Sequence, residues 1–112
     1  MSPADAARAP LRLIVAASTT SAGVPECLAE AESLGLSGGD AHVLLTEEGL
    51  DLLRTPWAGR LDAARVATSI CTRSARARRL DPERTPPSAR WSSLTSFLAA
   101  TPEGARVWTA FP

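Results

Sequence analysis

Residues 66–80 read VATSICTRSARARRL, an apolar run followed at once by an arginine-rich one. The run at 65–70 predicts a strand, and the spacing at 73–80 predicts a helix. Cys71 lies between them, at a strand-to-helix junction. A helix dipole and the nearby Arg73 are expected to lower the pKa of a thiol at that position. The stretch therefore predicts a βα unit with a candidate nucleophile, and a buried, inert cysteine is the competing interpretation.

The same alternation of strand and helix extends over the rest of the chain. Apolar runs predict strands at 11–18, 41–46, 65–70 and 105–111, with a very short one at 89–91. Helical patterns are predicted from Pro25, near Leu50, near Leu61, at 73–80 and from Ser93, with a surface loop at 55–59 and a Pro-rich break at 81–88. This order favours an α/β fold with a mainly parallel sheet.

Length and composition set the domain organisation. The chain has 112 residues, which suits a single domain with its own core. Residues 1–10 are rich in Ala and Pro and are expected to be a flexible lead-in. Residues 11–112 are expected to form one α/β domain.

Composition also excludes several kinds of chemistry. The net charge is zero, so neither nucleic acid nor a membrane surface is an expected partner. All basic residues are arginine, which excludes Schiff-base chemistry and a P-loop lysine. One His and two Cys cannot form a four-ligand structural zinc site, and neither a metal nor a cofactor is expected. His42 opens a predicted strand at the end opposite to the usual α/β site, so a surface or packing role is expected.

The same features bear on the compartment. The longest apolar stretch, Leu13–Ala17, is far shorter than the roughly 20 residues of a membrane-spanning helix. Two cysteines can hardly form a disulfide framework. Reduced thiols and a cytoplasmic location are therefore expected.

Right-handed crossovers should bring the strand-to-helix turns to one edge of a parallel sheet. The turns at this edge are Ser18–Gly23, Thr46–Gly49 and Cys71–Ser74. They carry several hydroxyls, two carboxylates and a thiol. The carboxylates of Glu47 and Glu48 are expected to be solvated, because adjacent turn residues diverge and a carboxylate near Cys71 would oppose its ionisation.

Two further sets of residues complete the predicted site. Main-chain N–H groups of Thr72, Arg73 and Ser74 are the expected donors to a Cys71 thiolate. Cys27 lies in the first turn of the first helix, near the same edge. It is either a second, resolving thiol for Cys71 or a cysteine packed against the sheet.

Three stretches share the pattern of a known family. SICTRSARARRL (69–80) places Cys71 at a strand end, with Ala75 and Arg78 four and seven residues later. DAHVLLTEEGLDLL (40–53) has the pattern of a second strand with a Gly-containing turn, and SSLTSFLAATPEGARVWTAF (92–111) that of a final helix and strand. Together they resemble the DsrE/TusD-like sulfur-relay proteins over nearly all of 11–111. Arg79 replaces a Gly of the family, so the chain is expected to leave that helix by another route.

The resemblance implies a three-layer α/β/α domain with a parallel sheet of about five strands. It also implies assembly as a trimer or hexamer. Cys71 would accept sulfane sulfur from a donor protein, hold it as a persulfide and pass it to an acceptor protein. Several branches of the family lack the cysteine, so membership alone does not establish sulfurtransferase activity.

Two other functions stay open. The first is a non-catalytic oligomeric module that binds a small anionic ligand or a protein partner at the same edge, with donors from Ser18, Thr19, Thr20 and Ser21. The second is an acidic-partner or nucleic-acid patch formed by Arg73, Arg76, Arg78, Arg79 and Arg84. These arginines do not form one helical stripe, so a solvated face or an oligomer contact is favoured. Trp57, Trp91 and Trp108 are expected to pack in the core or at a subunit interface.

Overall fold

The computed structural model describes residues 9–80, 85 and 89–111. The predictions for the lead-in at 1–8, for Arg84 and for most of the Pro-rich break at 81–88 lie outside the described residues.

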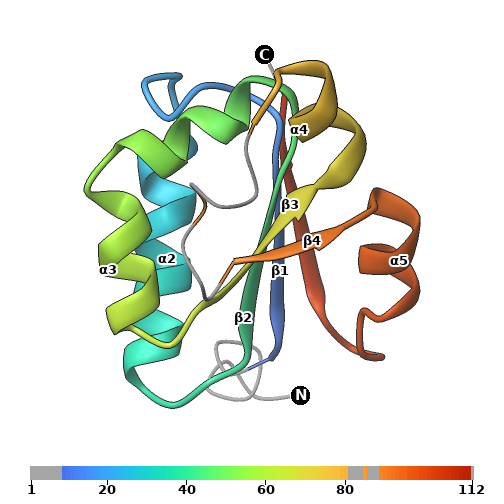
Figure 1. Ribbon diagram of the computed structural model, residues 1–112. Coiled ribbons are helices and arrows are strands. Elements are labelled where there is room, and N and C mark those ends of the chain that lie inside the picture. Colours follow the sequence, from blue (N-terminus) through green and yellow to red (C-terminus); the bar gives the residue numbers. More distant parts are fainter. Residues whose placement is uncertain (1–8, 81–84, 86–88, 112) are drawn as a thin grey trace.

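Among the described residues, five strands form one parallel sheet (Figure 1). The strands are β1 (Leu11–Val15), β2 (Ala41–Leu45), β3 (Ala67–Cys71), β4 (Arg90–Ser92) and β5 (Arg106–Ala110), in the spatial order β4-β3-β2-β1-β5. The predicted parallel α/β sheet is therefore confirmed. The chain starts in β1, adds strands on one side as far as β4, and then crosses to the other side of β1 for β5. Beside β1 the direction of winding changes, and such a switch point is where α/β sheets usually bind ligands.

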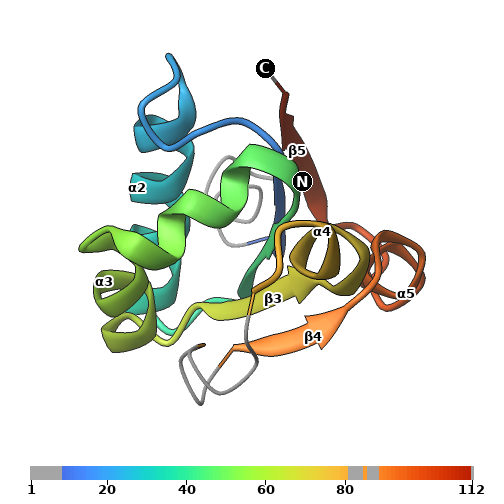
Figure 2. The ribbon, with the colours of Figure 1, turned by 45° about the horizontal axis from the view of Figure 1, so that its top comes forward.

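Helices cover both faces of this sheet (Figures 1 and 2). The α-helices α2 (Val24–Leu36) and α3 (Trp57–Ala63) and the 3₁₀ helix η1 (Glu47–Arg54) lie on one side. Helix α5 (Leu94–Ala99) lies on the other side, and the short helix α4 (Thr72–Ala77) lies at the carboxyl-terminal edge of the strands. None of the helices in the described residues is long and apolar enough to span a membrane.

Side-chain alternation along the strands creates two cores. In β1, Leu11, Leu13 and Val15 join the larger core under α2. Ile14 points the other way and joins Leu44, Cys71 and Phe97 in a smaller core under α5. All five residues of β1 are buried, as a strand without polar alternation predicts. The buried guanidinium of Arg12 is neutralised by two 3.0 Å contacts with the carboxylate of Asp40.

The predicted loop at 55–59 is wrong from Trp57 onward, because α3 begins there. The hydroxyl of Thr55 accepts a hydrogen bond from the N–H of Trp57 at 3.2 Å. The guanidinium of Arg60 stacks 3.9 Å from the centre of the Trp57 ring and also pairs with Glu32 of α2 at 2.7 Å. The first two contacts are local to the start of α3, and the pair with Glu32 ties α3 to α2.

Candidate functional site

Cys71 is the last residue of β3 and the residue that precedes α4, at the predicted edge of the sheet. Its side chain faces α5 and belongs to the smaller core with Ile14, Leu44 and Phe97. Only 9% of the residue is exposed. The structure thus confirms the position of the thiol and shows it largely covered.

Polar groups from two elements surround the sulfur of Cys71. Burial acts to raise the pKa of this thiol. The N–H and hydroxyl of Ser74, the hydroxyl of Thr46 and the N–H of Arg73 act in the opposite direction, and together they lower the pKa of Cys71. Ser74 is buried in α4, and Thr46 directly follows β2. The site is therefore a thiol whose anion is favoured by discrete hydrogen-bond donors.

Sequence reasoning did not single out Thr46 as a partner of Cys71. The strand register contains the signal that could have found it. Leu45 pairs with Ile70 in the parallel register of β2 and β3, so the next residues along, Thr46 and Cys71, lie side by side. That register cannot be predicted until the order of the strands in the sheet is known.

A hydroxyl network links Ser74 to a carboxylate. The hydroxyl oxygens of Thr46 and Ser74 lie 2.8 Å apart, and the Ser74 hydroxyl donates to Oε1 of Glu47 at 3.2 Å. Glu47 is exposed, as expected for an acidic residue in a turn, but its carboxylate also accepts this hydrogen bond from Ser74. Its backbone has φ of 50°, in the left-handed region that residues other than glycine seldom adopt.

The turn that carries Thr46 and Glu47 is fixed by backbone contacts. The N–H of Thr46 donates to the carbonyl of Val15 at 3.0 Å, and the N–H of Gly49 donates to the carbonyl of Thr46 at 2.9 Å. Gly49 packs directly on the end of β1, where a Cβ atom would lie 1.9 Å from the carbonyl oxygen of Val15. The turn therefore requires glycine at this position.

The three residues that follow Cys71 have different roles. Ser74 acts on Cys71 through both its N–H and its hydroxyl, and Arg73 acts through its N–H. The Arg73 side chain is exposed, and its charge is not among the causes of the Cys71 shift, so the expectation that this charge lowers the pKa was wrong. Thr72 instead donates its hydroxyl to the carbonyl of Ser92 at 3.0 Å, which ties the start of α4 to the end of β4.

Helix α4 is shorter than predicted and ends in an unexpected way. It has 6 residues, and the chain turns at Arg79, whose φ is 54°. The N–H of Leu80 then donates to the carbonyl of Ala75 at 2.9 Å, closing the helix end. The expectation of another route was wrong, because Arg79 adopts the left-handed conformation that glycine would favour.

The structure does not bring Cys27 to Cys71. Cys27 is half-buried in α2 and packs against the larger core, whereas Cys71 lies on the opposite face of the sheet. Burial, with the charges of Glu30 and Glu26, raises the pKa of Cys27. The interpretation as a cysteine packed against the sheet is supported, and that as a resolving thiol is not.

The hydroxyl turn after β1 is occupied by the protein's own carboxylate. Ser18 donates its hydroxyl to Asp51, and the N–H of Thr19 donates to the same carboxylate at 3.1 Å. A small anion at this turn would have to displace Asp51 and would be repelled by it. The turn is therefore a poor anion site.

The remaining candidates have structural roles or project into solvent. Nε2 of His42 lies 2.7 Å from the Ser69 hydroxyl, and its ring packs edge-on against Phe97 with centroids 4.9 Å apart. Burial lowers the pKa of His42, so the packing role is confirmed.

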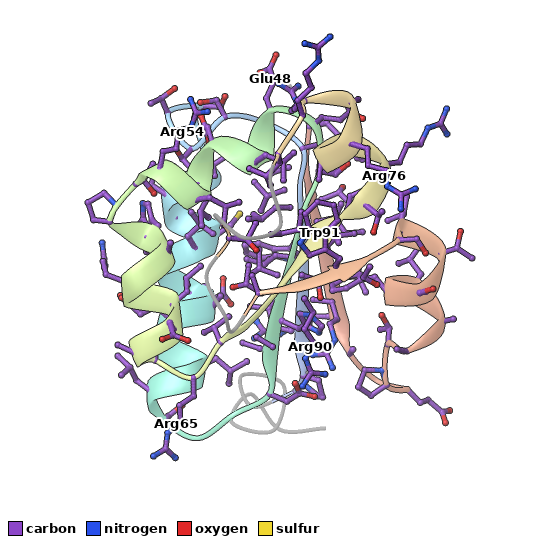
Figure 3. All side chains as sticks on the ribbon, in the orientation of Figure 1. Glu48, Arg54, Arg65, Arg76, Arg90 and Trp91 are labelled. Carbon is purple, nitrogen blue, oxygen red and sulfur yellow. The ribbon has the colours of Figure 1, made fainter. Side chains whose placement is uncertain are left out.

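Figure 3 shows Arg76 and Glu48 pointing outward from the carboxyl edge. Within the described ranges, no group of three or more His, Cys, Asp or Glu side chains could hold a metal ion.

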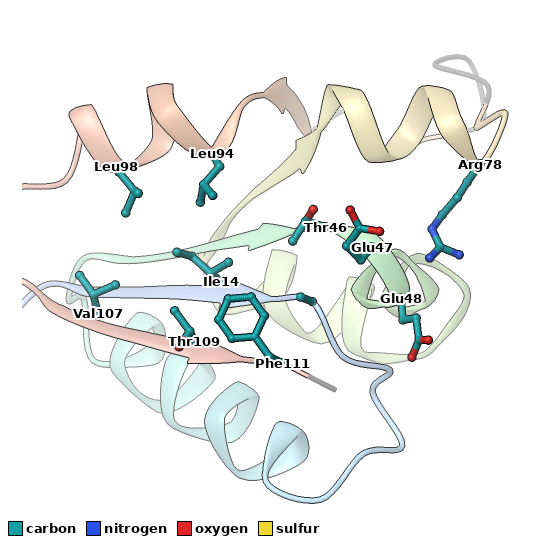
Figure 4. Close-up of a pocket in the computed structure, with 11 residues that line it drawn as sticks. Ile14, Thr46, Glu47, Glu48, Arg78, Leu94, Leu98, Val107, Thr109 and Phe111 are labelled. Carbon is teal, nitrogen blue, oxygen red and sulfur yellow. The ribbon is translucent and has the colours of Figure 1, made fainter.

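A cavity of about 620 Å³ opens between α5 and the neighbouring strands β1 and β5 (Figure 4). Its walls are mostly apolar and its far end is polar; the lining residues are Ile14, Ala16, Thr46, Glu47, Glu48, Arg78, Leu94, Leu98, Val107, Thr109 and Phe111. Leu94 and Leu98 face Ile14 and the side chains of β5 across it. Because Thr46 also acts on Cys71, the polar end lies one side chain away from the sulfur.

No protein-family model and no curated protein matches this sequence.

Proposed function

We propose that this protein is a sulfur carrier that accepts sulfane sulfur as a persulfide on Cys71. The observation that supports this function is the set of donors around one sulfur atom at the carboxyl edge of the sheet. The hydroxyls of Thr46 and Ser74 and the N–H groups of Arg73 and Ser74 favour the thiolate over the thiol. The same donors suit a persulfide anion, which carries its charge on sulfur as well.

The transfer needs no oxidant. The Cys71 thiolate attacks the outer sulfur of a donor persulfide, R–S–SH. A new S–S bond forms on Cys71, the donor's S–S bond breaks, and the donor leaves as the thiolate R–S⁻. An acceptor thiolate then attacks the outer sulfur on Cys71 and regenerates the original thiolate.

A persulfide also eases access to this covered site. The added sulfur extends the side chain by about 2 Å, the length of an S–S bond. Thr46 lies between Cys71 and the cavity, so the proposed exit for the outer sulfur is the polar end of that cavity. Donor and acceptor proteins in a reducing cytoplasm are the proposed partners.

Mass spectrometry of the intact protein tests this proposal. After incubation with a persulfide donor and removal of excess reagent, we expect the wild type to gain the mass of one sulfur atom and Cys71→Ser to gain none. Cys27→Ser is the matched control, because Cys27 lies on the other face of the sheet and its pKa is raised. It should load like the wild type. Unloaded wild type, or equal loading of wild type and Cys71→Ser, contradicts the assignment and favours the non-catalytic module.

We further propose that a second copy of this chain covers the apolar part of the cavity and leaves its polar end open. Leu94, Leu98, Val107 and Phe111 are 44%, 45%, 43% and 65% exposed, although all four line one hollow. β5 is also an edge strand of the sheet, with one side free of a neighbouring strand among the described residues. An apolar patch beside a free strand edge is typical of a subunit contact.

The assembly is tested by sedimentation. We expect the wild type to sediment as an oligomer, consistent with a trimer or hexamer, and Leu98→Glu to shift it to monomer, because a carboxylate cannot be buried there without a partner. Leu36→Glu is the control: Leu36 is 70% exposed at the end of α2, away from the cavity. A monomeric wild type, or equal effects of the two changes, would argue against this surface.

A further inference from the structure

We propose that Glu47 is a positioning residue that controls the protonation of Cys71 through the hydroxyl of Ser74. This inference rests on the proposed function, because it concerns the protonation of the same thiol. It assigns a role to a carboxylate that the sequence pattern indicated to be merely solvated.

The geometry forces a choice on one proton. The Ser74 hydroxyl carries a single hydrogen and has three possible acceptors around it. These are Oε1 of Glu47 at 3.2 Å, the Thr46 hydroxyl oxygen at 2.8 Å and the sulfur of Cys71. A hydrogen donated to Glu47 is not available to the sulfur. The carboxylate of Glu47 therefore competes with the sulfur of Cys71 for the Ser74 hydrogen.

Two arrangements of hydrogens follow. In the first, Ser74 donates to the Glu47 carboxylate, and its oxygen accepts the S–H of Cys71. In the second, the S–H bond has broken and its proton has gone to water, and Ser74 has turned its hydrogen from the carboxylate to the thiolate. Ionisation of Cys71 therefore costs Glu47 its hydrogen bond from Ser74, and water replaces that bond at the exposed carboxylate.

The backbone holds Glu47 where this exchange requires it. Its left-handed φ of 50° is maintained by the contacts of the 46–49 turn with Val15 and by the close packing of Gly49. A strained conformation that tertiary contacts impose is a common mark of a functional position. The exposed carboxylate and the covered sulfur are thus joined by one buried hydroxyl.

Other charged or titratable groups face this region from each neighbouring element. Glu48 of η1 and Arg78, just after α4, line the same cavity, and Arg73 and Arg76 project from α4. From β2, His42 packs against Phe97 on the far side of the smaller core. None of these charges is among the causes of the Cys71 pKa shift, whereas Glu47 shares the Ser74 hydroxyl with Cys71. Comparing Glu47 with its neighbour Glu48 therefore separates a shared hydrogen from a nearby charge.

The test is the pH dependence of Cys71 alkylation by iodoacetamide, measured in a Cys27→Ser background. In Glu47→Gln the amide keeps the shape of the side chain and can donate to the Ser74 oxygen, which frees the Ser74 hydrogen for the thiolate. We expect alkylation at mildly acidic pH to become about tenfold faster, because the carboxylate no longer competes with the thiolate for one hydrogen bond. Glu48→Gln should change the rate by less than about threefold. Circular dichroism checks that each variant is folded.

A double-mutant cycle decides between a shared hydrogen and simple charge removal. In a Ser74→Ala background, Glu47→Gln should lose its tenfold effect and match Glu48→Gln. Equal effects of the two glutamates, an unchanged rate in Glu47→Gln, or the same effect with and without Ser74 would overturn the proposal. Alkylation requires no sulfur donor, so a protein that shows this coupling but never loads sulfur refutes the proposed function and leaves the present inference standing.

Discussion

Gly49→Ala is expected to lower the free energy of unfolding by about 3 kcal/mol or more, over a hundredfold in the folding equilibrium. The new Cβ atom would lie 1.9 Å from the carbonyl oxygen and 2.7 Å from the carbonyl carbon of Val15. Both are backbone atoms at the end of the interior strand β1, so no side-chain rotation can relieve the contact. Either the turn moves away from the sheet or β1 shifts out of register with β2.

Urea denaturation measures this difference. Gly59→Ala is the matched control, since Gly59 lies inside α3 with open space around its Cα. Alanine there should stabilise the protein by about 0.5–1 kcal/mol, because it favours the helix. A Gly49→Ala protein within about 1 kcal/mol of the wild type would show that β1 and the turn do not pack this closely.

The parallel sheet and the edge that carries the site could be predicted from the sequence. Apolar runs such as 41–46 are read directly as buried strands, and the handedness of crossovers fixes which turns share an edge. Cys71 appears at that edge as expected. These features depend on local pattern and general topology, and both are visible before any contact is known.

The partners of the thiol could not be predicted in the same way. Thr46 meets Cys71 through strand register, and Glu47 meets Ser74 through a strained turn that packing on Val15 imposes. The separation of Cys27 from Cys71 likewise depends on which face of the sheet each side chain takes. Along a strand, a shift of one residue moves a side chain to the other face of the sheet. Two turns at the same edge can therefore carry side chains that lie on opposite faces.

The double variant Thr46→Val, Ser74→Ala is expected to slow the alkylation of Cys71 at pH 7 about a hundredfold. Burial is the largest influence on this thiol and opposes its ionisation; the two hydroxyls belong to the set of donors that outweighs it. Each hydrogen bond to an anion contributes about tenfold in the thiolate fraction, so losing both leaves burial dominant. The alkylation midpoint should then move to higher pH than in the wild type.

Thr46→Ser is the control for this experiment, because it keeps the hydroxyl and removes only a methyl group; its rate should stay within about threefold of the wild type. The stability of the folded protein gives an independent check of the sign. A thiol whose pKa is lowered by folding stabilises the protein above its unfolded pKa, and that contribution is lost as the pH falls through the folded value. In the double variant this dependence should disappear or reverse. An unchanged rate and an unchanged pH dependence would mean that the hydroxyls at the carboxyl edge do not act on Cys71, and that the site lacks the means to hold a sulfur anion.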